Sequence, residues 1–152
     1  MAEEHRVTIL IVDDDEGHTE LVRRNLRRTG ISNPIASVDN GSDALDYVFC
    51  HGVYANRPGN GELLILLDLR MPGGHDGVEV LRQIKVDPQA KSIPVIVLTT
   101  TDDPREINHC YELGCNVYIT KPIEPSAFID AIQRVGLMMS VMRMPTDPAR
   151  LP

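Results

Sequence analysis

Acidic side chains directly follow two apolar segments of this chain, Asp13 and Asp14 after the first and Asp68 after another. A threonine, Thr99, ends a third apolar segment, and a lysine, Lys121, follows a fourth. Carboxylates that are brought close together repel one another, so either some of them take up protons or a cation lies among them. The first question is therefore whether the fold gathers these side chains.

If it does, their types point to phosphoryl chemistry with a hard metal ion. Carboxylate oxygens without histidine or cysteine at matching positions favour Mg²⁺, which in turn favours phosphate as a further ligand. Lys121 can neutralise one phosphoryl oxygen and the Thr99 hydroxyl can donate a hydrogen bond to another. Asp68 then has the properties of a nucleophile that accepts a phosphoryl group, a reaction that needs mainly positioning and charge neutralisation.

The elements that must position these residues alternate along the chain. Apolar runs predict strands at 7–12, 34–38, 63–67, 94–98 and 117–119. Apolar stripes with helical spacing predict helices at 16–28, around 44–49, from about 76, at 103–113 and at 125–135. Several of these strands are unbroken aliphatic runs, as in strands covered on both faces, so we expect a doubly wound parallel α/β sheet. Ligands bind at the carboxyl ends of the strands in such sheets, where the candidate residues lie.

Composition restricts the class of protein. The chain has 152 residues, of which 42% are hydrophobic, and a formal net charge of −7. We expect one domain over residues 1–144 and a loose proline-containing tail over 145–152. The acidic charge disfavours nucleic-acid binding. The three cysteines show no disulfide pattern, and the absence of a leader or a long apolar run predicts a cytoplasmic protein without a membrane segment.

Simpler roles exist for the same residue types. A single aspartate after a strand is usually a helix cap or a turn residue, and we assign Asp15 and Glu16 to the start of a helix. The five histidines do not cluster at metal-ligand spacing, so we interpret them as surface or packing residues, with His75 the exception to watch. Cys110 and Cys115 are expected to pack in the core.

Taken together, the segments around the candidate residues resemble the receiver domain of response regulators, the CheY-like fold. The resemblance extends over residues 7–136 and rests on the segments 9–15, 66–72, 76–77, 94–99 and 118–122.

The resemblance implies a five-stranded sheet of order 2-1-3-4-5 with five helices, the flavodoxin-like topology. It implies that Asp68 is phosphorylated by a sensor histidine kinase and that the protein is otherwise not an enzyme. Asp13 and Asp14 match the acidic pair that holds Mg²⁺ together with Asp68, and the backbone carbonyl of Arg70 matches the third protein ligand.

Three further positions match the family. Thr99 and Tyr118 match the switch pair, and Lys121 matches the lysine that contacts the phosphoryl group. Arg70 is a large, charged residue beside the site, and we expect it to alter the access of water to the phosphoryl group. We expect no output domain in this chain, so a protein partner, for example a downstream phosphotransfer protein, is expected to receive the signal.

A narrower resemblance links the chain to single-domain regulators that pair with phytochrome-type kinases. It rests on the segments 52–56 and 98–103 and on the apolar stretch 137–144. That stretch has more apolar side chains than one domain can bury, and methionines suit a binding surface. We therefore expect a homodimer with Leu137, Met138, Val141 and Met142 in its interface.

Three other functions fit the sequence less well. In a haloacid-dehalogenase-type phosphatase Asp13 would be the nucleophile, but the acidic pair Asp102–Asp103 precedes Lys121 where that family needs it afterwards. An FMN carrier shares the sheet order, but the acidic residues after the first strand would repel the FMN phosphate. A pseudo-receiver is expected to have lost Asp68, Thr99 or Lys121, all of which are present.

Overall fold

The protein folds around one parallel sheet with the strand order β2-β1-β3-β4-β5. The structure, a computed structural model, describes residues 7–28, 30–57, 62–71 and 76–121, together with Ser126 and Asp130. The strands are β1 (Thr8–Val12), β2 (Ile35–Val38), β3 (Leu63–Leu67), β4 (Val95–Thr99) and β5 (Val117–Thr120). The predicted order and parallel pairing are confirmed.

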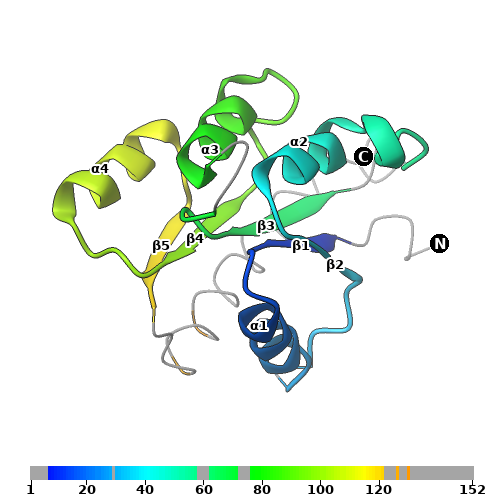
Figure 1. The fold of residues 1–152 in the computed structure, drawn as a ribbon, viewed down its shortest axis with the longest axis horizontal. Helices are drawn as coiled ribbons and strands as arrows, with labels where there is room; N and C mark the ends of the chain where they lie inside the picture. Colours follow the sequence, from blue (N-terminus) through cyan, green and yellow to red (C-terminus); the bar gives the residue numbers. More distant parts are fainter. Residues whose placement is uncertain are drawn as a thin grey trace, which may run out of the picture.

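Helices cover both faces of this sheet (Figure 1). Within the described residues the α-helices are α1 (Glu16–Arg28), α2 (Gly41–Phe49), α3 (Gly77–Val86) and α4 (Pro104–Leu113). In Figure 1, α2, α3 and α4 lie above the sheet and α1 lies below it. The predicted fifth helix, 125–135, falls almost wholly outside the described residues.

Alternation along the strands divides the core into two halves. Leu10 and Val12 of β1 pack on the side of α2 and α3, whereas Ile9 and Ile11 pack on the side of α1. The five residues of β3 are all buried, and so are those of β4. Because both faces of these central strands are covered, their sequences are aliphatic throughout, apart from Thr99 at the end of β4.

Polar side chains cap the starts of three helices that surround the sheet. The side chains of Asn40, Asp76 and Asp103 accept hydrogen bonds from backbone N–H groups at the starts of α2, α3 and α4. Helix α4 ends at Gly114, whose φ of 110° lies in the left-handed region that glycine adopts without strain. The connection between α2 and β3 contains a short 3₁₀ helix, η2 (Gly52–Tyr54).

Candidate functional site

The carboxyl ends of the strands meet because the hydrogen bonds of the sheet continue one residue beyond the strands. The N–H of Asp13 donates to Val38, and the N–H of Asp68 donates to Val12 at 2.9 Å. The N–H of Lys121 donates to the carbonyl of Thr99. Residues from four strands are therefore fixed at one edge by their backbones, which leaves their side chains to form the site.

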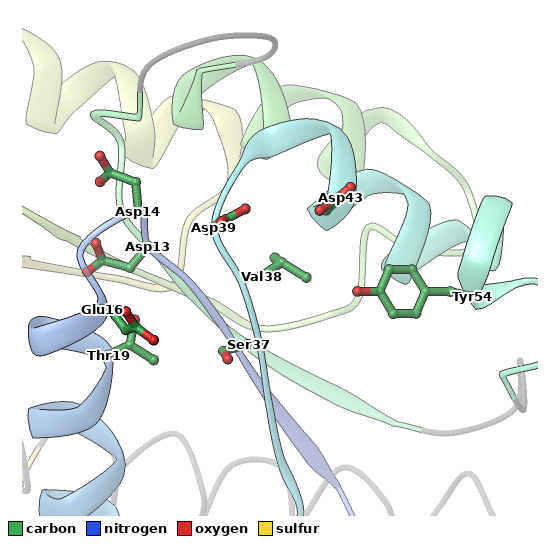
Figure 2. Close-up of a pocket in the computed structure, with 9 residues that line it drawn as sticks. All are labelled: Asp13, Asp14, Glu16, Thr19, Ser37, Val38, Asp39, Asp43 and Tyr54. Carbon is green, nitrogen blue, oxygen red and sulfur yellow. The ribbon is translucent and has the colours of Figure 1, made fainter.

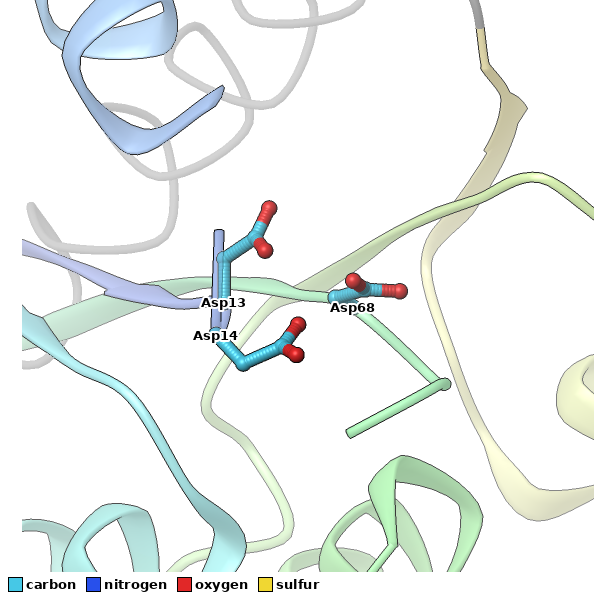
Figure 3. A group of neighbouring side chains, drawn as sticks. All are labelled: Asp13, Asp14 and Asp68. Carbon is cyan, nitrogen blue, oxygen red and sulfur yellow. The ribbon is translucent and has the colours of Figure 1, made fainter. Parts of the chain in front are cut away.

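Three carboxylates form the centre of the site (Figure 3). One oxygen from each of Asp13, Asp14 and Asp68 lies within 4.8 Å of the other two. Asp13 and Asp68 are buried, and Asp14 is exposed. This donor set consists of oxygen atoms and has an open side, which fits a hard divalent ion such as Mg²⁺ that keeps some of its water.

Lys121 places a positive charge between the two buried acids. Its Nζ lies 3.2 Å from Asp13 Oδ2 and 3.3 Å from Asp68 Oδ2. Its side chain is itself only 13% exposed. One ammonium group, which follows the outermost strand β5, therefore contacts both carboxylates.

The two buried acids differ in their electrostatics. Burial raises the pKa of Asp68 above its ordinary value, although the Arg70 N–H and Lys121 oppose the shift. Burial also acts on Asp13, but hydrogen bonds from His18 and Asp15 and the charge of Lys121 outweigh it, so the pKa of Asp13 lies below its ordinary value. Asp13 is thus the better stabilised anion, and Asp68 is the more basic carboxylate.

A close backbone contact fixes the segment after Asp68. The N–H of Gly77 donates to the carbonyl of Leu69 at 3.0 Å. A Cβ at Gly77 would lie 2.4 Å from the Asp68 carbonyl oxygen and 2.4 Å from Leu69 Cα. Only glycine allows the start of α3 to approach this segment so closely. The N–H of Arg70 donates to Asp68 Oδ1 at 3.1 Å, which orients the carboxylate.

Thr99 and Tyr118 lie on the neighbouring strands β4 and β5. The Thr99 side chain is fully buried, and its hydroxyl has no hydrogen-bond partner in the part of the chain that the structure describes. The Tyr118 hydroxyl donates to the carbonyl of Thr101 at 2.9 Å. A buried hydroxyl without a partner is costly, and at this position it is an available donor for a group bound near Asp68.

His18 contacts Asp13, which the sequence did not predict. Its Nδ1 lies 2.5 Å from Asp13 Oδ2, so the prediction of a surface or packing role is wrong for this histidine. No periodic pattern in the sequence indicates this contact, because it depends on how α1 leaves β1. Asp15 accepts from the N–H of His18, which confirms its role at the start of the helix.

A pocket with a volume of about 410 Å³ adjoins the carboxylates (Figure 2). It lies between the ends of β1 and β2 and the helices α1 and α2. Its lining is strongly acidic: Asp13, Asp14, Glu16, Thr19, Ser37, Val38, Asp39, Asp43 and Tyr54. Such a surface attracts cations and repels anions that approach from this side.

Some predicted site residues cannot be compared with the structure. His75 and the predicted interface residues Leu137, Met138, Val141 and Met142 lie outside the described residues. Arg70 is described, and its backbone lies at the site, but its predicted role as a metal ligand stays a prediction. Cys110 and Cys115 are buried, as expected. No helix among the described residues is long and apolar enough to span a membrane.

Known proteins resemble this chain over most of its length. The model of the response regulator receiver domain family matches residues 9–133. The response regulator Rcp1 of Synechocystis sp. is 39% identical over 113 residues, which cover 74% of this chain and 75% of Rcp1.

Two solved structures share the fold. The phosphorylated cyanobacterial phytochrome response regulator RcpA has a TM-score of 0.73 and 36% identity over 86% of this chain and 91% of its own. The Mn²⁺-bound form of Rcp1 has a TM-score of 0.73 and 35% identity over 85% of this chain and 91% of its own.

Proposed function

The chain belongs to the response regulator receiver domain family, and we propose that it accepts a phosphoryl group on Asp68 from a sensor histidine kinase. The observation that carries this proposal is the environment of the Asp68 carboxylate. One oxygen accepts from Lys121, the other accepts from the Arg70 N–H, and the carboxylates of Asp13 and Asp14 adjoin it. This is a site for charge neutralisation around an added phosphoryl group.

In the reaction, an oxygen of the Asp68 carboxylate attacks phosphorus, and the bond from phosphorus to the donor's imidazole nitrogen breaks. The nitrogen keeps the electron pair, so the products are an acyl phosphate and a free histidine. Lys121 neutralises charge on the phosphoryl oxygens, and the backbone N–H of Arg70 keeps the carboxylate oriented. Asp13 holds Lys121 in place from its other side.

Mg²⁺ is the cofactor we propose for this site. Asp13, Asp14, Asp68 and the carbonyl of Arg70 would hold it, and it would neutralise charge on the transferred group. The solved Mn²⁺-bound form of Rcp1 supports a divalent ion in a relative of this chain.

Thr99 and Tyr118 are the pair we propose to carry the response. A phosphoryl group adds about −1.5 to −2 charges and three acceptor oxygens. The unpartnered Thr99 hydroxyl would donate to one of them, and its rotation would free space for the Tyr118 ring. Tyr118 would then leave the carbonyl of Thr101, which changes the surface formed by α4 and β5.

The proposed phosphoryl donor is a sensor kinase of the phytochrome type. The name of RcpA, a phytochrome response regulator, supports this choice. A protein partner, for example a downstream phosphotransfer protein, would read the changed surface.

We also propose a homodimer through the apolar stretch that contains Leu137, Met138, Val141 and Met142 and through the face of α4 and β5. Its support is the sequence alone. Sedimentation velocity of the full chain and of Met142→Glu tests it. A dimer that the substitution dissociates agrees with the proposal, and a monomeric wild type contradicts it.

Intact-mass spectrometry with acetyl phosphate tests the phosphorylation directly. We expect a single added phosphoryl group in the presence of Mg²⁺ and none after chelation. Asp68→Asn removes the acceptor, and Asp102→Asn is the control with the same charge change at an exposed residue outside the group of three carboxylates. Labelling of Asp68→Asn equal to that of the wild type would favour the alternative nucleophile, Asp13, and refute the assignment.

A further inference from the structure

Arg70 connects the acceptor site to helix α4. Its backbone N–H donates to Asp68 Oδ1, and its guanidinium Nη2 lies 3.6 Å from Oε2 of Glu106 in the first turn of α4. The Arg70 side chain is 63% exposed, whereas that of Glu106 is 25% exposed. One residue therefore contacts the acceptor carboxylate through its backbone and α4 through its side chain.

Glu106 in turn lies close enough to Tyr118, a residue of the proposed switch pair, to act on its charge. Burial raises the pKa of Tyr118, and the negative charge of Glu106 raises it further, while Arg70 lowers it. The tyrosine hydroxyl is held by the carbonyl of Thr101, three residues before α4 begins. The Arg70–Glu106 pair thus adjoins the region that the proposed response would move.

This ion pair is suited to exchange. It is partly exposed and its atoms are separated by 3.6 Å, so solvent screens it and little packing holds the arginine. Glu106 also lies in the first turn of α4, where the helix dipole favours a negative charge. The dipole therefore partly stabilises the Glu106 carboxylate even without Arg70.

We propose that Arg70 exchanges partners when Asp68 carries a phosphoryl group, leaving Glu106 and binding the phosphoryl oxygens. This inference rests on the proposed function. A phosphoryl group has more charge than a carboxylate and three acceptor oxygens for the guanidinium fork. The exchange releases α4 from the segment after β3 at the moment of phosphorylation. Glu106 therefore competes with the phosphoryl group for Arg70.

Competition predicts that substitutions of Arg70 and Glu106 have opposite effects on phosphoryl binding, which a static ion pair does not predict. If the pair only stabilised the fold, Arg70→Gln and Glu106→Gln would act in the same direction. If the partners exchange, Arg70→Gln removes a side chain that binds the phosphoryl oxygens, so the affinity for the phosphoryl group falls. Glu106→Gln removes the competitor for Arg70, so that affinity rises. The effect of Glu106→Gln must also disappear when Arg70 is already glutamine.

Beryllofluoride, a phosphoryl mimic, is the probe that separates these cases. Its affinity for the full chain is measured by ¹⁹F NMR titration with Mg²⁺ present. We expect Arg70→Gln to weaken binding and Glu106→Gln to tighten it, each by about two- to fivefold. Glu112→Gln is the matched control, because it removes the same charge from an exposed position on the same helix.

Two results would overturn the exchange: equal effects of Glu106→Gln and Glu112→Gln, or a Glu106→Gln effect that persists in the double variant with Arg70→Gln. The proposed function fails separately, if beryllofluoride binds the wild type no better than it binds Asp68→Asn. That result would overturn the exchange as well, because there would be no phosphoryl group on Asp68 for Arg70 to bind.

Discussion

Nζ of Lys121 lies 3.3 Å from Oδ2 of Asp68, although 53 residues separate them in the chain. The parallel pairing of β3 with β4 and of β4 with β5 brings the two residues to the same edge of the sheet. The same ammonium group lies 3.2 Å from Asp13. Lys121 therefore contacts both buried carboxylates at once.

Replacing Lys121 by methionine should raise the pKa of Asp68 further, because Lys121 lowers it in the wild type. We expect the free energy of unfolding at about pH 7 to fall by roughly 1–3 kcal/mol, since two buried acids lose a partner. The loss should diminish as the pH falls through the folded pKa of Asp68, because a protonated acid needs no cation.

Carboxyl-detected ¹³C NMR measures the pKa of Asp68, and urea unfolding measures the stability of the Lys121→Met variant. Lys91→Met is the control, because Lys91 is exposed and its Nζ has no contact with the described acids. An unchanged pKa of Asp68 in Lys121→Met would contradict the proposed electrostatic coupling.

Asp68→Asn should stabilise the metal-free protein at neutral pH. The folded-state pKa of Asp68 is raised above the unfolded value, so ionisation of this side chain opposes folding. Its contribution is favourable below the unfolded pKa and is lost as the pH rises through the folded pKa. Asparagine carries no such cost and still accepts from the Arg70 N–H. Urea unfolding across this pH range measures the difference, and an Asn variant less stable than wild type at about pH 7 would show that the contact with Lys121 outweighs desolvation.

Asp14→Ala should remove the stabilisation that Mg²⁺ gives the wild type. A ligand that binds only the folded state at about tenfold its dissociation constant adds roughly 1.4 kcal/mol. Asp14 is exposed, so its truncation leaves no buried group unpaired. Thermal melts with and without Mg²⁺ measure the effect, and Asp102→Ala controls for the loss of one exposed negative charge. A wild type whose melting temperature does not respond to Mg²⁺ would contradict the metal site.

Gly77→Ala should destabilise the fold by about 1–3 kcal/mol, because the new Cβ overlaps backbone atoms of Asp68 and Leu69. Gly17→Ala is the matched control on α1, where the nearest atom outside the helix backbone lies at 3.4 Å. That change should be neutral or stabilise by up to about 1 kcal/mol through helix propensity. Equal unfolding midpoints for Gly77→Ala and the wild type would show that the contact can relax.

The strands and the centre of the site could be predicted from local patterns. The run 63–67 is apolar at every position because β3 is buried on both faces, and Asp68 follows it directly. Since parallel strands end at one edge, the gathering of Asp13, Asp68 and Lys121 followed from topology. The family resemblance supplied the strand order, which patterns alone leave open.

Side-chain contacts between elements could not be predicted in the same way. The contact of His18 with Asp13 depends on the angle at which α1 leaves β1 and on one side-chain rotamer. The pairing of Arg70 with Glu106 depends on how α4 packs beside the segment after β3. Neither contact follows from a periodic pattern in the sequence, because each joins two polar side chains near the carboxyl edge of the sheet.

Chemical mapping of the phosphorylated residue tests the central claim most directly. The protein is incubated with acetyl phosphate and Mg²⁺, the acyl phosphate is reduced with borohydride, and the resulting homoserine is located by peptide mass spectrometry. The account predicts homoserine at position 68 and at no other aspartate. Homoserine at position 13 or 14, or its complete absence from a folded, Mg²⁺-loaded sample, would contradict the assignment of Asp68 as the phosphoryl acceptor.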